Sequence, residues 1–282
     1  MISASNKKAK NAFEELLSRE NYLVTQANDL AKAFGNLSSL EHKVLDYCFS
    51  HVKVQDTKNI MYTDNLLNLM HHLGLTRSGD SYKRIADALR SLNLKTALYL
   101  RTIEPDGKRA ILMTHLFDHV KVIEDSKFEF RFSQDVEPYI FQLKESFYSF
   151  KLSELAIVKS KYTLTLMKLW NAQGRGVWNP RNLPNATIEG SLEEWESWFL
   201  GSNDKGNLKQ WPAGRFKQNV LMVALKELDR LYPNVMYDLL LIKKKRRVVG
   251  YRLTITPFKK HELGQIDVVL DRMENSNESD FV

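Results

Sequence analysis

The sequence has a single cysteine, no long apolar run and no motif typical of export. Cys48 cannot form a disulfide within the chain, which favours a reducing compartment and a role as a small buried hydrophobe. No stretch approaches about 18 consecutive apolar residues, and the charged start has no apolar run behind it. Neither a membrane span nor a signal peptide is indicated, so we expect a cytoplasmic, soluble protein that does not act on a membrane.

Patterns typical of metal sites and enzymes are also missing. His71 and His72 are adjacent, so on a helix they would point about 100° apart, and no cysteine or carboxylate cluster completes a ligand set. His115 and His119 would lie about 13 Å apart on a strand, too far to share one ion. There is no Walker loop for ATP and no nucleophile elbow, although sequence alone leaves a Ser-His-Asp arrangement open. We expect no metal, no other cofactor and no enzymatic activity.

Positive charge is what the chain has in excess. It carries 41 Lys and Arg against 34 Asp and Glu, a net charge of +7 with a pI near 9.2. Residues 261–282 contain six acids and one base, a net charge of −5, which leaves residues 1–260 with +12. This distribution favours an anionic partner such as nucleic acid or an acidic membrane surface.

The first half of the chain shows three helical patterns followed by strands. Alternating apolar runs on either side of Pro105-Asp106-Gly107 predict a hairpin, and FEFRF at 128–132 predicts a further strand. The three helices are expected to begin at Ser38 or Ser39, at Thr63, and at about Ser78.

The second half repeats this order. A helical pattern at 160–170 is followed by a short helix that Ser191 and Glu194 begin as a capping box, then by a long amphipathic helix over 213–232. Two apolar runs follow it as a second hairpin. LGL at 73–75 and ALRSL at 88–92 match LGS at 200–202 and ALKEL at 224–228, at offsets of 127 and 136 residues, which favours two copies of one unit.

Three helices and a hairpin make the winged form of the helix-turn-helix, whose third helix enters the major groove of DNA. The predicted fold class is therefore α+β, with two tandem winged helix-turn-helix domains related by internal duplication. We expect an N-terminal domain over residues 1–150, a C-terminal domain over 151–258 and an acidic tail over 259–282.

The long helix of the second copy presents a polar face to the outside. Its predicted inward stripe runs from Val220 to Tyr232, which leaves side chains outside that can pair with base edges, with Lys217 at the rim near phosphate. The predicted outward residues are Arg215, Gln218, Asn219, Met222 and Lys226.

Five consecutive cations separate the last two strands, in the run LIKKKRRVVGY. Because alternate residues of a strand point inward, the charges predict a turn near Lys244 to Arg246 and a wing whose tip contacts phosphates. The predicted phosphate contacts of this wing are Lys243, Lys244, Lys245, Arg246 and Arg247.

In the first copy the corresponding helix offers a second basic face, and its amino end a phosphate anchor. A single amphipathic helix more often presents a solvated face, but two such helices, each followed by a basic hairpin, favour DNA. The predicted DNA contacts here are Arg77, Ser78, Ser81, Lys83 and Arg84, with Asp87 and Arg90 also on the outward face.

Three stretches together resemble the replication initiator (Rep) proteins of theta-replicating, iteron-bearing plasmids. They are LVTQANDLAKAFGNLSSLEHKVLDY at 23–47, SELAIVKSKYTLTLMKLW at 153–170 and GRFKQNVLMVALKELDRL at 214–231. The resemblance implies a non-enzymatic initiator that binds direct repeats of double-stranded origin DNA, opens adjacent AT-rich DNA and recruits host replication initiator and helicase proteins. It also implies dimerisation through the first domain, with the dimer repressing its own gene.

Two other functions stay open at this stage. A plain transcription regulator could use the same winged-helix fold without any role in replication. A rolling-circle initiator would be an enzyme that nicks DNA with a tyrosine and a metal, and it needs a His-apolar-His pair on a strand, which this chain lacks.

Overall fold

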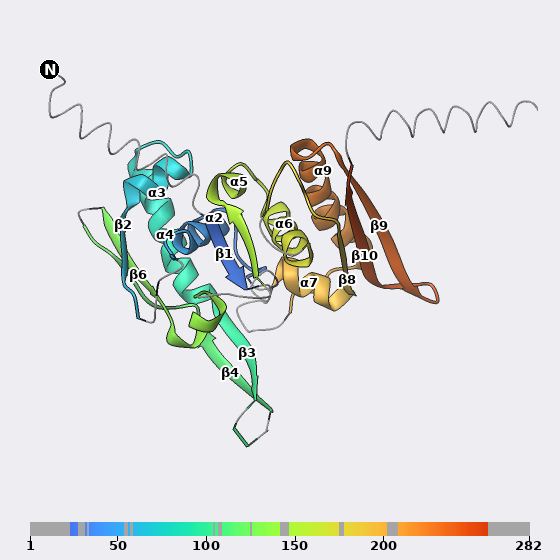
Figure 1. Ribbon diagram of the computed structural model, residues 1–282, viewed down its shortest axis with the longest axis horizontal. Coiled ribbons are helices and arrows are strands. Elements are labelled where there is room, and N and C mark those ends of the chain that lie inside the picture. The colour runs from blue at the N-terminus through green and yellow to red at the C-terminus, as the bar shows by residue number, and fades with distance from the viewer. Residues whose placement is uncertain are drawn as a thin grey trace, which may run out of the picture.

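Two α+β units lie side by side along the long axis of the molecule in the computed structural model (Figure 1). The predicted acidic tail at 259–282 lies outside the described residues. No helix in the described part of the chain is long and apolar enough to cross a membrane. The structure describes residues 23–27, 32, 34–53, 56, 59–103, 105, 106, 109–124, 126–141, 147–174, 178–201 and 208–258.

In the part of the chain that the structure describes, the first unit contains the helices α2, α3 and α4 and a three-stranded antiparallel sheet in the order β2-β6-β5. A separate two-stranded hairpin, β3–β4, lies between α4 and β5 in the sequence, and β1 pairs with β7. The elements are β1 (Leu23–Ala27), α2 (Ser39–Phe49), β2 (Tyr62–Asn65), α3 (Leu66–His72), α4 (Gly79–Lys95), β3 (Ala97–Ile103), β4 (Arg109–His115), β5 (Phe117–Val122), β6 (Lys127–Phe132), the 3-10 helix η2 (Gln134–Tyr139) and β7 (Phe147–Lys151).

The second unit repeats this plan with a sheet in the order β8-β10-β9. A short helix, α5, leads into it from the first unit. The elements are α5 (Leu152–Ala156), α6 (Lys161–Gln173), β8 (Ala186–Ser191), α7 (Leu192–Leu200), α8 (Ala213–Phe216), the π-helical turn η3 (Lys217–Leu221), α9 (Met222–Leu231), β9 (Val235–Lys244) and β10 (Arg247–Pro257).

Each unit therefore runs helix, strand, helix, helix, strand, strand, with equivalent sheet orders. This is the winged-helix plan, and the predicted fold class of two tandem winged helix-turn-helix units is confirmed. The prediction of the first unit's wing is wrong in one detail. The hairpin predicted around Pro105 exists as β3–β4, but it is an additional hairpin, and the wing of the first unit is β5–β6. A period of two in the sequence identifies a strand but not the strand with which it pairs. The position of β6 is set by the burial of Phe128, Phe130 and Phe132 against the helices.

Helix starts follow the predicted caps in most places. Ser78 caps α4, as expected, but the prediction of Thr63 as the cap of α3 is wrong. Asn65 takes that role because residues 62–65 first extend as β2 against β6. Complete capping boxes begin α2 and α7, formed by Ser38 with Glu41 and by Ser191 with Glu194.

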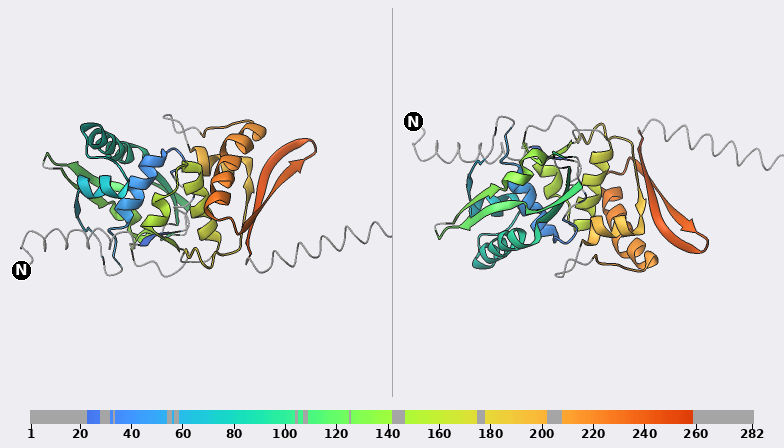
Figure 2. Two further views of the ribbon diagram at one scale, coloured as in Figure 1. Left: turned by 90° about the horizontal axis from the view of Figure 1, so that it is seen from above. Right: turned by 90° about the horizontal axis from the view of Figure 1, so that it is seen from below.

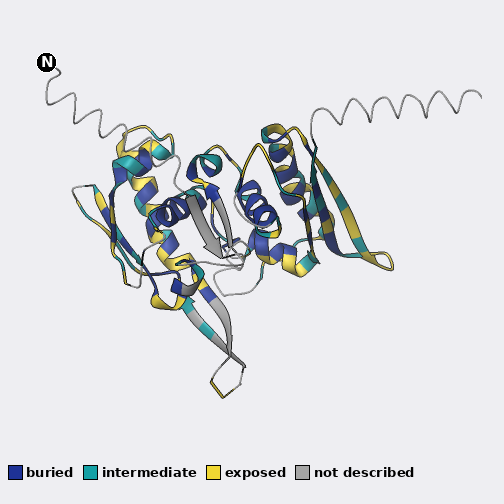
Figure 3. Ribbon diagram, viewed as in Figure 1, coloured by how far each residue is buried: buried dark blue, intermediate teal, exposed yellow. Residues whose placement is uncertain are grey.

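Aromatic side chains fill the core of the second unit, and buried residues line the inner faces of both units' helices (Figure 3). The indole of Trp195 donates to the carbonyl of Tyr251 at 3.1 Å, and Phe216 packs against the Tyr251 ring. Cys48 is buried in the first unit, as expected, and burial raises the pKa of its thiol.

The two units share a polar interface between α2 and α6. At its centre the Lys168 ammonium lies 2.6 Å from the Asp46 carboxylate, and both side chains are buried. At its edge Lys161 donates to the carbonyl of Gly35 at 2.9 Å, and burial lowers the pKa of Lys161 to about 8. Gly35 itself lies against the last turn of α7, where a Cβ would come within 2.6 Å of a backbone carbonyl oxygen. The units are thus held in one arrangement by buried contacts.

Candidate nucleic-acid interface

Residues 213–231 form one long helix with a π-helical turn inside it. The Met222 N–H donates to the carbonyl of Lys217, five residues back, between the α-helical segments α8 and α9. The amino end is tied to the sheet because the Tyr251 hydroxyl donates to the Ala213 carbonyl at 2.6 Å, and burial raises the pKa of Tyr251 to about 12. π-Turns of this kind are frequent at functional sites. The predicted helix is confirmed, but its π-turn was not predicted.

The predicted inward stripe of this helix is confirmed. Its side chains are buried under the helix, and they are Val220, Leu221, Ala224, Leu225, Leu228 and Tyr232. Of the predicted outward residues, Arg215, Gln218, Asn219 and Lys226 are exposed, and Lys217 is half-buried.

Met222 is only partly outward. It is half-buried and packs against the core, because it lies at the edge of the stripe beside Leu221 and Leu225. Met222 therefore lies at the edge of the predicted outward face, with part of its side chain at the surface.

Arg215 is held by an aromatic ring at the amino end of the helix. Its guanidinium carbon lies 4.5 Å from the centroid of the Trp211 ring, within the range of a cation–π contact. The backbone N–H of Trp211 donates to the buried Glu196 carboxylate at 2.6 Å, which fixes that residue in turn. Arg215 is exposed, so its donors remain available to a ligand while its position is restrained.

The β9–β10 hairpin extends away from the body of the molecule as a long wing (Figure 1, Figure 2). Lys244 pairs with Arg247 across a two-residue turn, and Lys245 in that turn has a φ of 56°. The predicted turn near Lys244 to Arg246 is confirmed. All five cations from Lys243 to Arg247 are exposed, and none forms an ion pair within the described residues.

The wing of the first unit differs from it in charge. Two of its cations pair with acids on the neighbouring strand: Arg131 lies 3.0 Å from Asp118, and Lys121 lies 3.4 Å from Glu129. The basic hairpin predicted for the first half is β3–β4, so the sequence did not predict this charge pairing on β5–β6. The unpaired positive charge of the described wings is concentrated on β9–β10.

The helix α4 of the first unit presents most of its predicted outward residues. Its exposed residues include Arg77 and Ser78 at the amino end and Lys83, Arg84, Asp87 and Arg90 along one face. The prediction that Ser81 lies on the outward face is wrong. Only 5% of Ser81 is exposed, and its hydroxyl accepts a hydrogen bond from the Ser78 hydroxyl at 3.1 Å. Ser81 lies inward because it is four residues before Ile85 and so belongs to the buried stripe.

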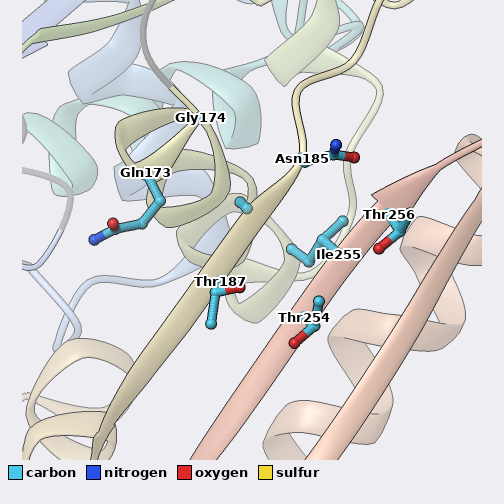
Figure 4. A pocket seen from close by; sticks show the side chains of 8 residues that line it. Gln173, Gly174, Asn185, Thr187, Thr254, Ile255 and Thr256 are labelled. Carbon is cyan, nitrogen blue, oxygen red and sulfur yellow. The ribbon is translucent and has the colours of Figure 1, made fainter.

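A hollow of about 520 Å³ lies beside the end of α6 and the strands β8 and β10 (Figure 4). Threonine hydroxyls and amide groups line it, and its lining includes no charged side chain. Among the residues that the structure describes, no three His, Cys, Asp or Glu side chains come together as a metal site.

Comparison with known proteins identifies the family of this chain. A family model described as "Initiator Replication protein, WH1" matches residues 23–171, more than half of the chain. The chain belongs to this family of replication initiators. Among curated proteins, no sequence matches it significantly.

Solved structures resemble this replication initiator in fold. The Pi initiator protein, crystallised in complex with iteron DNA, matches with a TM-score of 0.64 and 13% sequence identity over 86% of this chain and 99% of that chain. Domains 2 and 3 of RctB match over 78% of this chain and 82% of theirs, at 13% identity and a TM-score of 0.41. The WH1 domain of MSBI1.176, a replication protein isolated from a multiple sclerosis patient, matches over 50% and 95%, at 16% identity and a TM-score of 0.34.

Two further features of the 213–231 helix were not predicted from the sequence. The contact between Arg215 and Trp211 depends on where the loop before the helix returns, which no local pattern specifies. The exposure of Val223 does follow from helical periodicity, because Val223 lies four residues after the outward Asn219. Val223 is identified as exposed when every outward position of the helix is considered, apolar as well as polar.

Proposed function

We propose that this initiator binds directly repeated DNA sites, iterons, at a plasmid origin and starts replication there without catalysing a reaction. The observation that carries the proposal is the exposed polar face of the 213–231 helix, followed at once by a wing with five exposed, unpaired cations. A winged helix needs both parts: one to read bases and one to neutralise phosphates.

The C-terminal domain, residues 151–258, acts as the principal reader in this account. Arg215 binds a guanine edge through two parallel hydrogen bonds, and Gln218 and Asn219 bind adenine edges in the same way. The exposed part of Met222 contacts the neighbouring base edges. Lys217 and the cations Lys243, Lys244, Lys245, Arg246 and Arg247 contact phosphates, which supplies affinity without sequence preference.

The N-terminal domain, residues 1–150, adds an auxiliary contact. Its helix α4 offers Arg77, Ser78, Lys83 and Arg84 to a neighbouring groove face, and the buried Ser81 supports the helix start. Groove faces one helical turn apart lie about 34 Å from each other, so two linked domains can read one elongated site from one side. We assign no phosphate contact to β5–β6, because its cations Lys121 and Arg131 are already paired.

The remaining roles are those that the resemblance to plasmid replication initiators implies. Because these roles are carried out in the cytoplasm, we propose that the protein acts there. A second copy pairs through the N-terminal domain, and that dimer represses the initiator's own gene. Bound monomers promote opening of AT-rich DNA and recruit the host's replication initiator and helicase proteins. The acidic tail over 259–282 has no assigned role.

Arg215→Ala is expected to weaken binding to the cognate repeat about fivefold to 150-fold, because one bidentate base contact is worth about 1–3 kcal/mol. Binding to unrelated duplexes should change less than about threefold, since phosphate contacts stay intact. Titration of labelled cognate and scrambled duplexes measures the affinity for the repeat and the affinity for unrelated DNA. Arg230→Ala, which removes an exposed arginine at the other end of the same helix, is the matched control. Equal losses on both duplexes would refute the assignment of Arg215 to base reading.

Footprinting of the DNA beside the gene separates the proposal from its alternatives. Protection of several directly repeated sites is expected for an iteron-binding initiator. Protection of a single palindromic operator would instead favour a transcription regulator. Incubation of supercoiled origin plasmid with Mg²⁺ or Mn²⁺ should leave no covalently tagged nick, and such a nick would favour a rolling-circle enzyme.

A further inference from the structure

One large apolar side chain projects from the outward face of the helix that we assign to base reading. Val223, on α9, is 41% exposed. Asn219 lies one turn before it and Lys226 one turn after it, and both are exposed. The middle of this face therefore presents an isopropyl group between an amide and an ammonium group.

Among the described residues, no contact of Val223 requires a valine at this position. Isolated exposed apolar residues are common on protein surfaces, so its location rather than its exposure carries the argument. Valine is a poorer helix former than the alanine, lysine or glutamate that an outward position accepts equally well. Its branched side chain is, however, held in nearly one rotamer on a helix, which makes it a stiff apolar contact surface.

We propose that Val223 is a specificity-determining residue that contacts the C5-methyl group of a thymine in the cognate site. The inference rests on the proposed function and adds an apolar contact to the polar ones. The major-groove edges of the base pairs present hydrogen-bonding groups and a single apolar group, the methyl of thymine. An isopropyl group can use neither the hydrogen-bonding groups nor a phosphate, so the methyl is the chemistry that it recognises.

A docking site for a protein partner would need more apolar surface than this face offers. Interface cores are built from contiguous apolar and aromatic side chains. On the outward face of α9 the neighbours of Val223 are polar or charged, and Met222 already packs against the core. A thymine methyl needs only one apolar contact, which favours DNA as the occupant.

Replacement of single thymines by deoxyuracil tests the contact, because it removes the C5-methyl group and nothing else. Duplexes of the footprinted site, each with one such replacement, are titrated with the full-length wild type and with Val223→Ala at fixed salt. We expect wild-type binding to weaken about three- to tenfold at one thymine, or at two neighbouring ones, as for loss of a buried methyl contact. The same replacement should change binding by Val223→Ala less than about 1.5-fold, whereas the other thymines affect both proteins alike.

Two controls keep the outcome decisive. Met61→Ala removes an apolar side chain of the same 41% exposure from outside the helix and should reproduce the wild-type deoxyuracil profile. Val223→Thr, which keeps one methyl, should retain part of the penalty. Identical profiles for the wild type and Val223→Ala would overturn the inference while leaving the proposed function intact. Failure of the wild type to prefer its footprinted site over scrambled DNA would instead refute the proposed function itself.

Discussion

Raising the salt concentration from 50 to 200 mM is expected to weaken DNA binding by this initiator about 10³- to 10⁵-fold. In the proposed arrangement the two domains read one elongated site and engage about 6–10 phosphates, and each neutralised phosphate releases counterions from the duplex. The exposed, unpaired cations Lys243 to Arg247 supply a large share of those contacts. Titration of a labelled duplex at several salt concentrations gives the slope of log affinity against log salt.

Single alanine substitutions in that run should flatten the slope by about one unit for each lost contact, on cognate and scrambled DNA alike. Lys121→Ala provides a control, because Lys121 is also an exposed wing cation but already pairs with Glu129. Its slope should match that of the wild type. A slope near zero for the wild type would be incompatible with nucleic-acid binding, and an equal effect of Lys121→Ala would show that the unpaired wing has no special role.

Asp46→Ala is expected to lower the free energy of unfolding by about 3–5 kcal/mol. The substitution leaves the Lys168 ammonium buried between α2 and α6 without its partner 2.6 Å away, and an uncompensated buried charge is costly. Both units contribute to this pair, so its loss weakens their mutual arrangement as well as the chain's stability. Urea unfolding of the wild type and the variant measures the difference.

The double variant Asp46→Leu with Lys168→Leu distinguishes the cost of a lone charge from a general loss of packing. It should recover most of the lost stability, since replacing a whole buried pair with apolar side chains is often neutral or better. Gly35→Ala probes the same interface without changing charge, because its Cβ would collide with the last turn of α7. A change below about 0.5 kcal/mol for Asp46→Ala would mean that the pair does not hold the units together.

Local features of the fold could be predicted because their causes are local. The capping box that begins at Ser38 and the stripe from Val220 to Leu228 depend on residues within a turn or two of one another. The turn at Lys245 follows from charges that a regular strand would point inward. These patterns were sufficient for the order of the main helices and for the hairpins β3–β4 and β9–β10, but they did not identify the strands β2, β5 and β8.

Features that depend on distant residues could not be predicted in the same way. Asp46 and Lys168 are 122 residues apart, and nothing near either one indicates the other. The same applies to strand partners, which is why the first wing was placed at β3–β4 rather than β5–β6. The pairing of charges is another feature of this kind. Nothing in the sequence near Arg131 indicates a partner for it, whereas in the fold it pairs with Asp118.

Sequence-specific DNA binding is the central claim, and a competition titration tests it most directly. The full-length protein is bound to a labelled duplex that carries the footprinted repeat, at about 150 mM salt. Unlabelled repeat and a scrambled duplex of the same composition then compete for it. We predict that the repeat competes at least about 10³-fold better, the lower end of the range for specific DNA-binding proteins. Equal competition by the two duplexes would contradict the account.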